Sequence, residues 1–235
     1  MEWPEYLEIG KHHLPLKVKR NRRARRICLR YSPTDHSLSL TLPKSVRLQE
    51  GIRFLNEKYD WLEQTLNEAP KHRRLRAGMT LPVLGKPHVT SHDPSLRRAY
   101  KLAAGELVVS GPDKAAVPRR IQDALKSHVR QEISQLVEQK AALLGKRYGR
   151  ISIRDTKSRW GSCSSEGNLN FCWRLVFAPR EVLEYVVSHE VAHLRHMDHS
   201  PAFWAAVERL CPGYEAAKEW LRINAQELYQ YRIAD

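Results

Sequence analysis

The sequence lacks the features that mark secreted, disulfide-rich and membrane-spanning proteins. Its 235 residues contain four cysteines and no CxxC pair, so a disulfide framework is not expected. The opening MEWPEYLEIGKHHLPLKVKR carries acids where a secretory leader carries basic residues, and no apolar run reaches the length of a membrane span. We therefore expect a protein of the cytoplasm with no membrane partner.

Acidic residues are scarce relative to basic ones. The chain has 40 Lys and Arg against 26 Asp and Glu, which gives a formal net charge of +14, and this excess favours anionic partners such as nucleic acid. The strongest basic run contains no acid and consists of Lys19, Arg20, Arg22, Arg23, Arg25, Arg26 and Arg30. It fits either the exposed face of a strand, where cations discourage edge pairing, or a surface for nucleic acid.

Hydrophobic residues make up 42% of the chain, as in ordinary folded proteins with their own core. The patterns predict an α+β fold with a β-rich amino-terminal module over residues 1–112 and a second domain over 113–235. In the module, short alternating runs predict strands over 17–31 and 36–43, and apolar residues at helical spacing predict one helix over 46–66. Runs between 80 and 112 predict further strands of the same sheet.

The second domain is predicted to begin with a long helix. Apolar residues from Ile121 to Leu144 recur at helical spacing and predict a helix that closes near Gly149. Two alternating runs flank the turn sequence SSEGN between residues 151 and 173 and predict a β-hairpin. Three helical patterns follow the hairpin.

The stretch SHEVAHLRHMDHSPAFW indicates a metal site. It lies at the end of a predicted helix that places His189 and His193 four positions apart, so both imidazoles can reach one ion. Glu190 lies beside this pair but is rotated away, where a general base for an activated water belongs. Chance would give at most about 0.06 HExxH matches in a chain of this composition, so the pattern favours a functional site over a histidine-rich helix end.

The third ligand must come from beyond a bend in the chain. On a continuous helix His196 would lie about 10.5 Å along the axis from His189, too far to close a tetrahedron with it. Ser200 and Pro201 resemble the N-cap and first position of a new helix, so the bend falls before them and favours His199. The alternatives are His196, Asp198, Glu208 and Glu215.

Three protein ligands leave a fourth position open, which is typical of catalytic zinc sites. A Zn²⁺ ion there would lower the pKa of a water to about 7, and Glu190 would accept its proton as it attacks a carbonyl. The sequence therefore predicts peptide-bond hydrolysis on a peptide or protein substrate. The second hypothesis is a nucleic-acid-binding protein with a structural or inactive zinc site, or a DNA-associated protease; the intact Glu190 favours the first.

Two motifs together carry a family resemblance. KSRWGSCSSEGNLNFCWRL followed by APREVLEYVVSHEVAHLRHMDHSPAFW resembles the YgjP-like zinc metallopeptidases, relatives of the SprT-like peptidases. The resemblance implies a zincin-type catalytic domain with His189, His193 and His199 as zinc ligands and Glu190 as catalytic acid and base. Metzincins share the HExxHxxxxxH spacing, but this chain lacks their glycine at position 196 and any methionine after Met197.

The sequence leaves two roles open. The RWGSCSS segment is interpreted as structural, with Gly161 in a tight turn, Trp160 in a core and Cys163 as a small buried group; alternatively, its strand borders the cleft and pairs with an extended peptide. No neighbouring residue in the sequence supports Cys163 as a nucleophile. Four residues are candidates for stabilising an oxyanion: Arg159, Arg174, Tyr185 and Tyr214.

Overall fold

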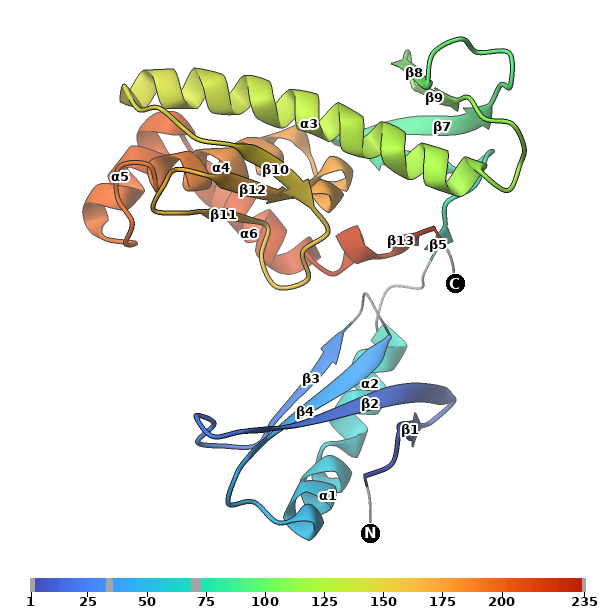
Figure 1. Ribbon diagram of the computed structural model, residues 1–235, viewed down its shortest axis with the longest axis vertical. Coiled ribbons are helices and arrows are strands. Elements are labelled where there is room, and N and C mark those ends of the chain that lie inside the picture. The colour runs from blue at the N-terminus through green and yellow to red at the C-terminus, as the bar shows by residue number, and fades with distance from the viewer. Residues whose placement is uncertain (1–2, 33–35, 69–72, 234–235) are drawn as a thin grey trace. The chain divides into compact units, whose positions relative to one another are not determined.

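The chain divides into two compact units, Met1–Lys71 (unit 1) and His72–Asp235 (unit 2). The computed structural model describes residues 3–32, 36–68 and 73–233 of them (Figure 1). The boundary expected between residues 112 and 113 falls inside unit 2. The reason is packing: Leu81 and Leu107, from before that boundary, share one apolar cluster with Ile121 and Leu125 from after it.

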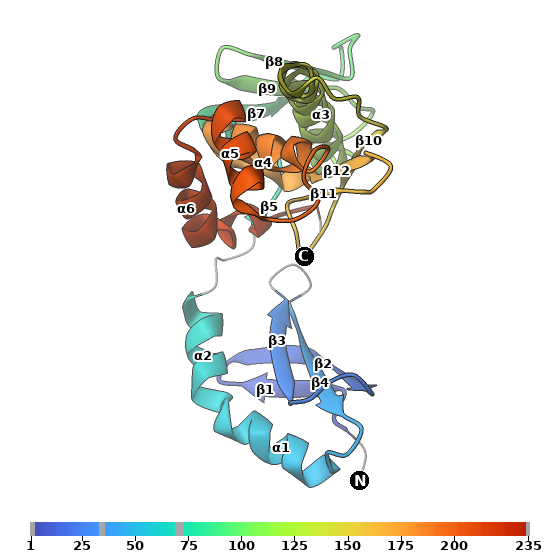
Figure 2. The same cartoon turned by 90° about the vertical axis from the view of Figure 1, so that its left-hand side faces the viewer.

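Unit 1 is a four-stranded sheet with two helices on one face (Figures 1 and 2). The strand order is β1-β2-β4-β3, with β2 and β4 parallel and both outer pairs antiparallel. Alternate residues of the strands, such as Leu14 and Leu16, face Leu55, Leu62 and Leu66 of the helices. The elements are β1 (Tyr6–Ile9), β2 (His12–Asn21), β3 (Cys28–Ser32), β4 (Ser37–Pro43), α1 (Leu48–Glu57) and α2 (Tyr59–Glu68).

The single helix predicted over 46–66 is wrong, because the chain changes direction at Lys58. This residue ends α1, and its amide nitrogen lies 3.1 Å from the carbonyl oxygen of Leu55 and 3.2 Å from that of Phe54. Apolar residues of both halves nevertheless join the same core. Helical spacing predicted which face is apolar, but it carries no signal for a local break.

Unit 2 begins with a second four-stranded sheet packed against a long helix. The strands predicted between 80 and 112 are present, but they form this separate sheet and do not extend the sheet of unit 1. Its order is β6-β7-β9-β8, and the strands are β6 (Thr80–Val83), β7 (Lys86–His92), β8 (Tyr100–Ala103) and β9 (Glu106–Val109). Helix α3 (Val117–Leu144) ends at Gly145, whose φ of 62° is the left-handed conformation typical of helix ends.

A three-stranded sheet of order β10-β12-β11 leads to the helical part of unit 2. It comprises β10 (Ile151–Arg154), β11 (Gly161–Cys163) and β12 (Leu169–Cys172). The hairpin predicted over 151–173 is wrong in its pairing: β10 runs parallel to β12, and the antiparallel partner of β12 is β11. Strand β11 therefore lies at the edge of this sheet, in contact with helix α4.

The helices that follow pack around α4 (Arg180–Ala192), which contacts α3, α5 (Pro201–Leu210) and α6 (Tyr214–Asn224). A 3-10 helix, η1 (Trp173–Phe177), precedes α4. At the end of the chain, η2 (Glu227–Tyr229) leads to β13 (Tyr231–Arg232), which pairs with β5 (Arg73–Arg74). Within the described ranges, no helix is both long enough and apolar enough to cross a membrane.

Candidate metal centre

Helix α4 presents His189 and Glu190 from a tightly packed segment. Its residues Leu183, Val187 and Val191 are fully buried in the core of unit 2, and this packing fixes the rotation of the helix about its axis. His189 and Glu190 follow Val187 on the side toward β11 and the start of α5. The first part of the HExxH motif is therefore held by a rigid element.

The helix ends at Ala192, and the chain then turns sharply. His193 is the residue that ends the helix, and the amide of His196 bonds to the carbonyl oxygen of Ala192 at 3.0 Å. The Nδ1 atom of His193 lies 2.9 Å from the carbonyl oxygen of His196, so Nδ1 donates and Nε2 remains free to bind an ion. His196 thus orients His193 through its backbone, a role that side-chain spacing could not reveal.

The next helix starts where the sequence predicted, with Ser200 as its N-cap and Pro201 in its first turn. The Ser200 hydroxyl donates to Asp198 Oδ1 at 2.9 Å, so Asp198 stabilises this turn. His199 is exposed immediately before the helix. The bend predicted between His196 and His199 is present.

Three imidazoles meet at this bend. One ligand atom from each of His189, His193 and His199 lies within 4.8 Å of the other two, and the Nε2 atoms of His189 and His199 are 3.2 Å apart. Two nitrogens that each lie about 2.0–2.1 Å from a tetrahedral ion are roughly 3.3 Å apart. Among the described residues no side chain of His196, Asp198, Glu208 or Glu215 joins this group.

Burial disfavours the charged form of two of these imidazoles. Burial lowers the pKa of His189 to about 4, helped by the neighbouring imidazoles, and burial also lowers the pKa of His193. A neutral imidazole is the form that binds a metal ion. The Nδ1 atom of His189 is buried without a hydrogen-bond partner among the described residues, so its interactions pass through Nε2.

Glu190 is buried beside the cluster, with 6% of its surface exposed. Burial raises the pKa of its carboxyl to about 7, and the charge of Arg159 opposes this shift. A Cβ atom added to Gly161 would lie 2.4 Å from Glu190 Oε1. Gly161 belongs to strand β11, so the tight turn predicted at this position is wrong. The missing side chain instead leaves room for the Glu190 carboxyl.

An open cleft of about 470 Å³ contains the three histidines and Glu190, and its opposite wall is β11 with the residues before it. Cys163 lines this cleft, but burial raises the pKa of its thiol to about 11, in agreement with its exclusion as a nucleophile. A second cavity of about 250 Å³ adjoins it and shares His189, Glu190, Gly161 and Arg159.

The four oxyanion candidates differ in whether they line the two cavities. Arg174 is buried, with its guanidinium bonded to Asp155 and to the carbonyl oxygen of Tyr231, and is therefore structural. Tyr214 stacks on Tyr185, which lines the second cavity. Arg159 lines both cavities.

Comparison with known proteins identifies the class. The YgjP-like, metallopeptidase domain family matches residues 25–224, so the chain belongs to this family, as the two motifs predicted. It is a metallopeptidase and acts on peptide or protein substrates.

Two solved structures are also similar to part of the chain. The metallopeptidase zymogen abylysin of Pyrococcus abyssi is 31% identical, with a TM-score of 0.35 over 40% of this chain and 93% of that one. The metallopeptidase zymogen jannalysin of Methanocaldococcus jannaschii is 21% identical, with a TM-score of 0.35 over 40% of this chain and 96% of that one. No curated protein matches.

Proposed function

We propose that the metal is Zn²⁺, that His189, His193 and His199 bind it, and that Glu190 is the general base of peptide-bond hydrolysis. The observation that carries this proposal is the convergence of three imidazoles beside a buried carboxyl group. An all-imidazole set of three is typical of catalytic zinc. The bound ion would supply Lewis-acid polarisation of the scissile carbonyl and lower the pKa of the attacking water.

Glu190 supplies the proton transfers. With its pKa near 7, its carboxylate can accept a proton from the attacking water, and the resulting acid can donate that proton to the departing amine nitrogen. Both transfers occur at the same side chain, in the cleft that holds the three imidazoles. A carboxylate with an ordinary pKa would be a weaker base in the first transfer.

Two neighbours of Glu190 are proposed to position the substrate. The exposed Arg159 would bind the carbonyl oxygen as negative charge develops on it, since it lines both cavities. Strand β11 pairs with β12 on one side and lies at the sheet edge on the other. An extended peptide would therefore add to β11 as a further strand, which would place its carbonyl groups across the cleft.

Substitution of Glu190 tests the proposal. The full chain and its Glu190→Gln variant should contain equal zinc by elemental analysis, because Glu190 is not a ligand, while hydrolysis of an unstructured protein substrate should fall by at least about 100-fold. His199→Ala should lose zinc. Arg159→Gln, a change in the wall of the cleft, should retain zinc and lose about 10- to 100-fold in kcat.

Two results would contradict the assignment. Unchanged hydrolysis in the Glu190→Gln variant would remove this residue from the mechanism. Full zinc content in the His199→Ala variant would mean that another side chain completes the site.

A further inference from the structure

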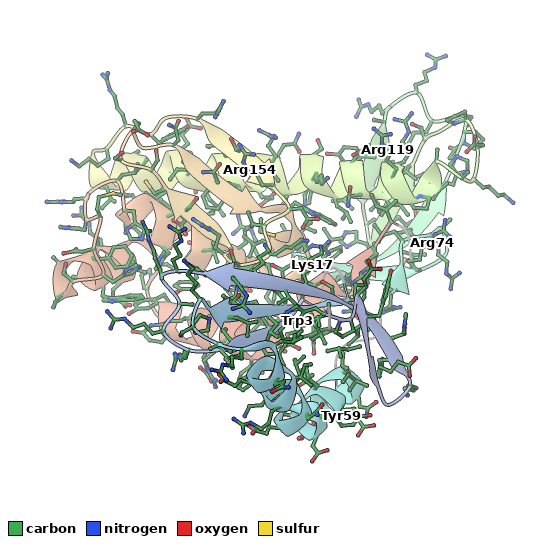
Figure 3. All side chains as sticks on the ribbon, turned by 60° about the horizontal axis from the view of Figure 1, so that its bottom comes forward. Trp3, Lys17, Tyr59, Arg74, Arg119 and Arg154 are labelled. Atoms are coloured by element: carbon green, nitrogen blue, oxygen red, sulfur yellow. The ribbon has the colours of Figure 1, made fainter. Side chains whose placement is uncertain are left out.

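One face of the sheet in unit 1 is covered by helices of the same unit, and no described element of unit 1 covers the other face. The buried leucines of β2 and β4 point toward α1 and α2, which lie on one side of the sheet in both ribbon views (Figures 1 and 2). Side chains alternate along a strand, so Lys17 and Lys19 of β2 lie on the opposite face, and both are exposed. Figure 3 labels Lys17 on this strand.

The strand register places cations on both sides of one hydroxyl residue and on one side of a second. Ser39 of β4 pairs with Lys17 on one side and with Arg30 of β3 on the other. Thr41 lies one pleat further along and pairs with Lys19. Adjacent strands are about 4.8 Å apart, so the backbones of Lys17 and Arg30 lie roughly 10 Å apart, with the short side chain of Ser39 between them. The middle of the face therefore carries short side chains and is flanked by cations.

The connection from β2 to β3 extends this charge. Residues 10–34 contain nine Lys and Arg and no Asp or Glu, and the connection itself carries four exposed arginines, Arg22, Arg23, Arg25 and Arg26. Lys17, Lys19 and Arg30 form no ion pair with any described residue. Arg20 differs, because its guanidinium bonds to the backbone carbonyls of Lys44 and Val46, so it holds the fold.

An aromatic pair lies on the same face. The rings of Tyr6 on β1 and His13 on β2 are stacked at 4.6 Å and 10°, and Tyr6 is 48% exposed. Glu8 is directly opposite His13, at the end of β2 remote from the arginine-rich connection. The face thus runs from an exposed aromatic platform to a strongly cationic end.

We propose that this face, defined by Tyr6, His13, Lys17, Lys19, Arg30, Ser39 and Thr41, binds single-stranded nucleic acid. The cations would contact phosphates, the short hydroxyl side chains in the middle would let the backbone lie on the strands, and the exposed Tyr6 ring would stack on a base. A cationic surface alone fits any polyanion; the aromatic platform beside it is what favours unpaired bases. This proposal is independent of the proposed zinc chemistry.

Fluorescence anisotropy with the full chain and a labelled 20-nucleotide single strand tests it. The Lys17→Gln, Lys19→Gln, Arg30→Gln variant should raise Kd by about 10-fold or more at low salt. It should also reduce the slope of log K against log salt by about 2, since each lost phosphate contact contributes about 0.7. Tyr6→Ala should weaken single-strand binding several-fold and leave duplex binding nearly unchanged.

The matched control removes three charges from α1 and its ends, through Arg47→Gln, Arg53→Gln and Lys58→Gln. These side chains are exposed, and the Arg53–Glu57 pair is solvent-exposed, so its loss costs little stability. Equal weakening by the control would show that net charge alone binds the strand and would overturn the proposed face. Binding of the chain to anionic phospholipid vesicles or to poly-glutamate, without binding of the oligonucleotide, would also overturn it.

Discussion

The raised pKa that suits Glu190 to its proposed role also lowers the stability of the metal-free fold at neutral pH. Its carboxyl has a pKa near 7 in the folded chain and about 4.3 in an unfolded one. Below the unfolded value the group is neutral in both states. As pH rises the unfolded state ionises first, so the metal-free fold loses on the order of 3 kcal/mol between about pH 4 and 7.

We therefore predict that Glu190→Gln stabilises the metal-free protein at pH 8 and has little effect at pH 4.5. Thermal unfolding in the presence of a chelator at both pH values would measure this difference. Glu138→Gln, at an exposed position of α3, is the matched control and should show no such pH dependence. Equal effects of Glu190→Gln at both pH values would contradict the burial argument.

Gly161 packs directly against the proposed general base, Glu190. A methyl group there would overlap the Glu190 carboxyl, so Gly161→Ala must displace this side chain, and a displacement of about 1 Å costs up to about 100-fold in rate. We predict a 10- to 100-fold lower kcat with zinc content retained. Gly111→Ala is the control, because a Cβ there meets its nearest atom at 3.6 Å; equal activity of the two variants would exclude the steric role.

The sequence predicted the members of the candidate cluster because they are close along the chain. His189 and His193 lie about one helical turn apart, and Pro201 marks the start of the next helix, which predicted the bend that brings His199 to them. The contact of Gly161 with Glu190 joins residues far apart in sequence and on different elements, so no local pattern encodes it. For the same reason the sequence could not separate Arg159 from Arg174.

At the scale of elements, Lys140 links three helices. Its ammonium on α3 bonds to Glu184 of α4 and, at 2.5 Å, to the carbonyl oxygen of Leu210 at the end of α5. Lys140 is 8% exposed, so removing its charge leaves a carboxylate and a carbonyl without their partner in a poorly solvated place. Breaking one side of such a pair costs about 3 kcal/mol.

We predict that Lys140→Met lowers the melting temperature of unit 2 by roughly 6–12 °C. Adding Glu184→Gln should restore part of this loss, because the unpaired charge is then absent. Lys146→Met, at an exposed position, should leave the transition unchanged. A double variant that is less stable than Lys140→Met would show that the unpaired carboxylate is not the source of the cost.

Pairing between elements was the least predictable part of the fold. Alternation identified the strands after residue 80, but whether they extend the first sheet or form another depends on the core that they share with α3. Likewise, β10 and β12 were recognised as strands, yet their parallel pairing depends on packing beyond the local sequence. Periodicity reports the faces of an element, and its neighbours are set by long-range contacts.

At the scale of the whole molecule, the residue range of the family match does not coincide with the boundary between the two units. The family match begins at residue 25, inside unit 1, and ends at residue 224 of unit 2. The part of unit 1 from residue 25 onward therefore lies within the family match, whereas β1 and β2 precede it. The candidate metal centre lies wholly in unit 2, while the proposed nucleic-acid face lies wholly in unit 1.

This separation predicts where metal binding stabilises the chain. A ligand that binds only the native state stabilises it by about 4 kcal/mol at 1,000 times its Kd, and the core that contains α4 is distinct from the core of unit 1. Zinc added to the metal-free chain should slow amide hydrogen exchange in peptides from α4 and α5 and leave those of β1–β4 unchanged. His199→Ala should abolish the effect. Equal protection of both units would show that they unfold as one, despite their separate cores.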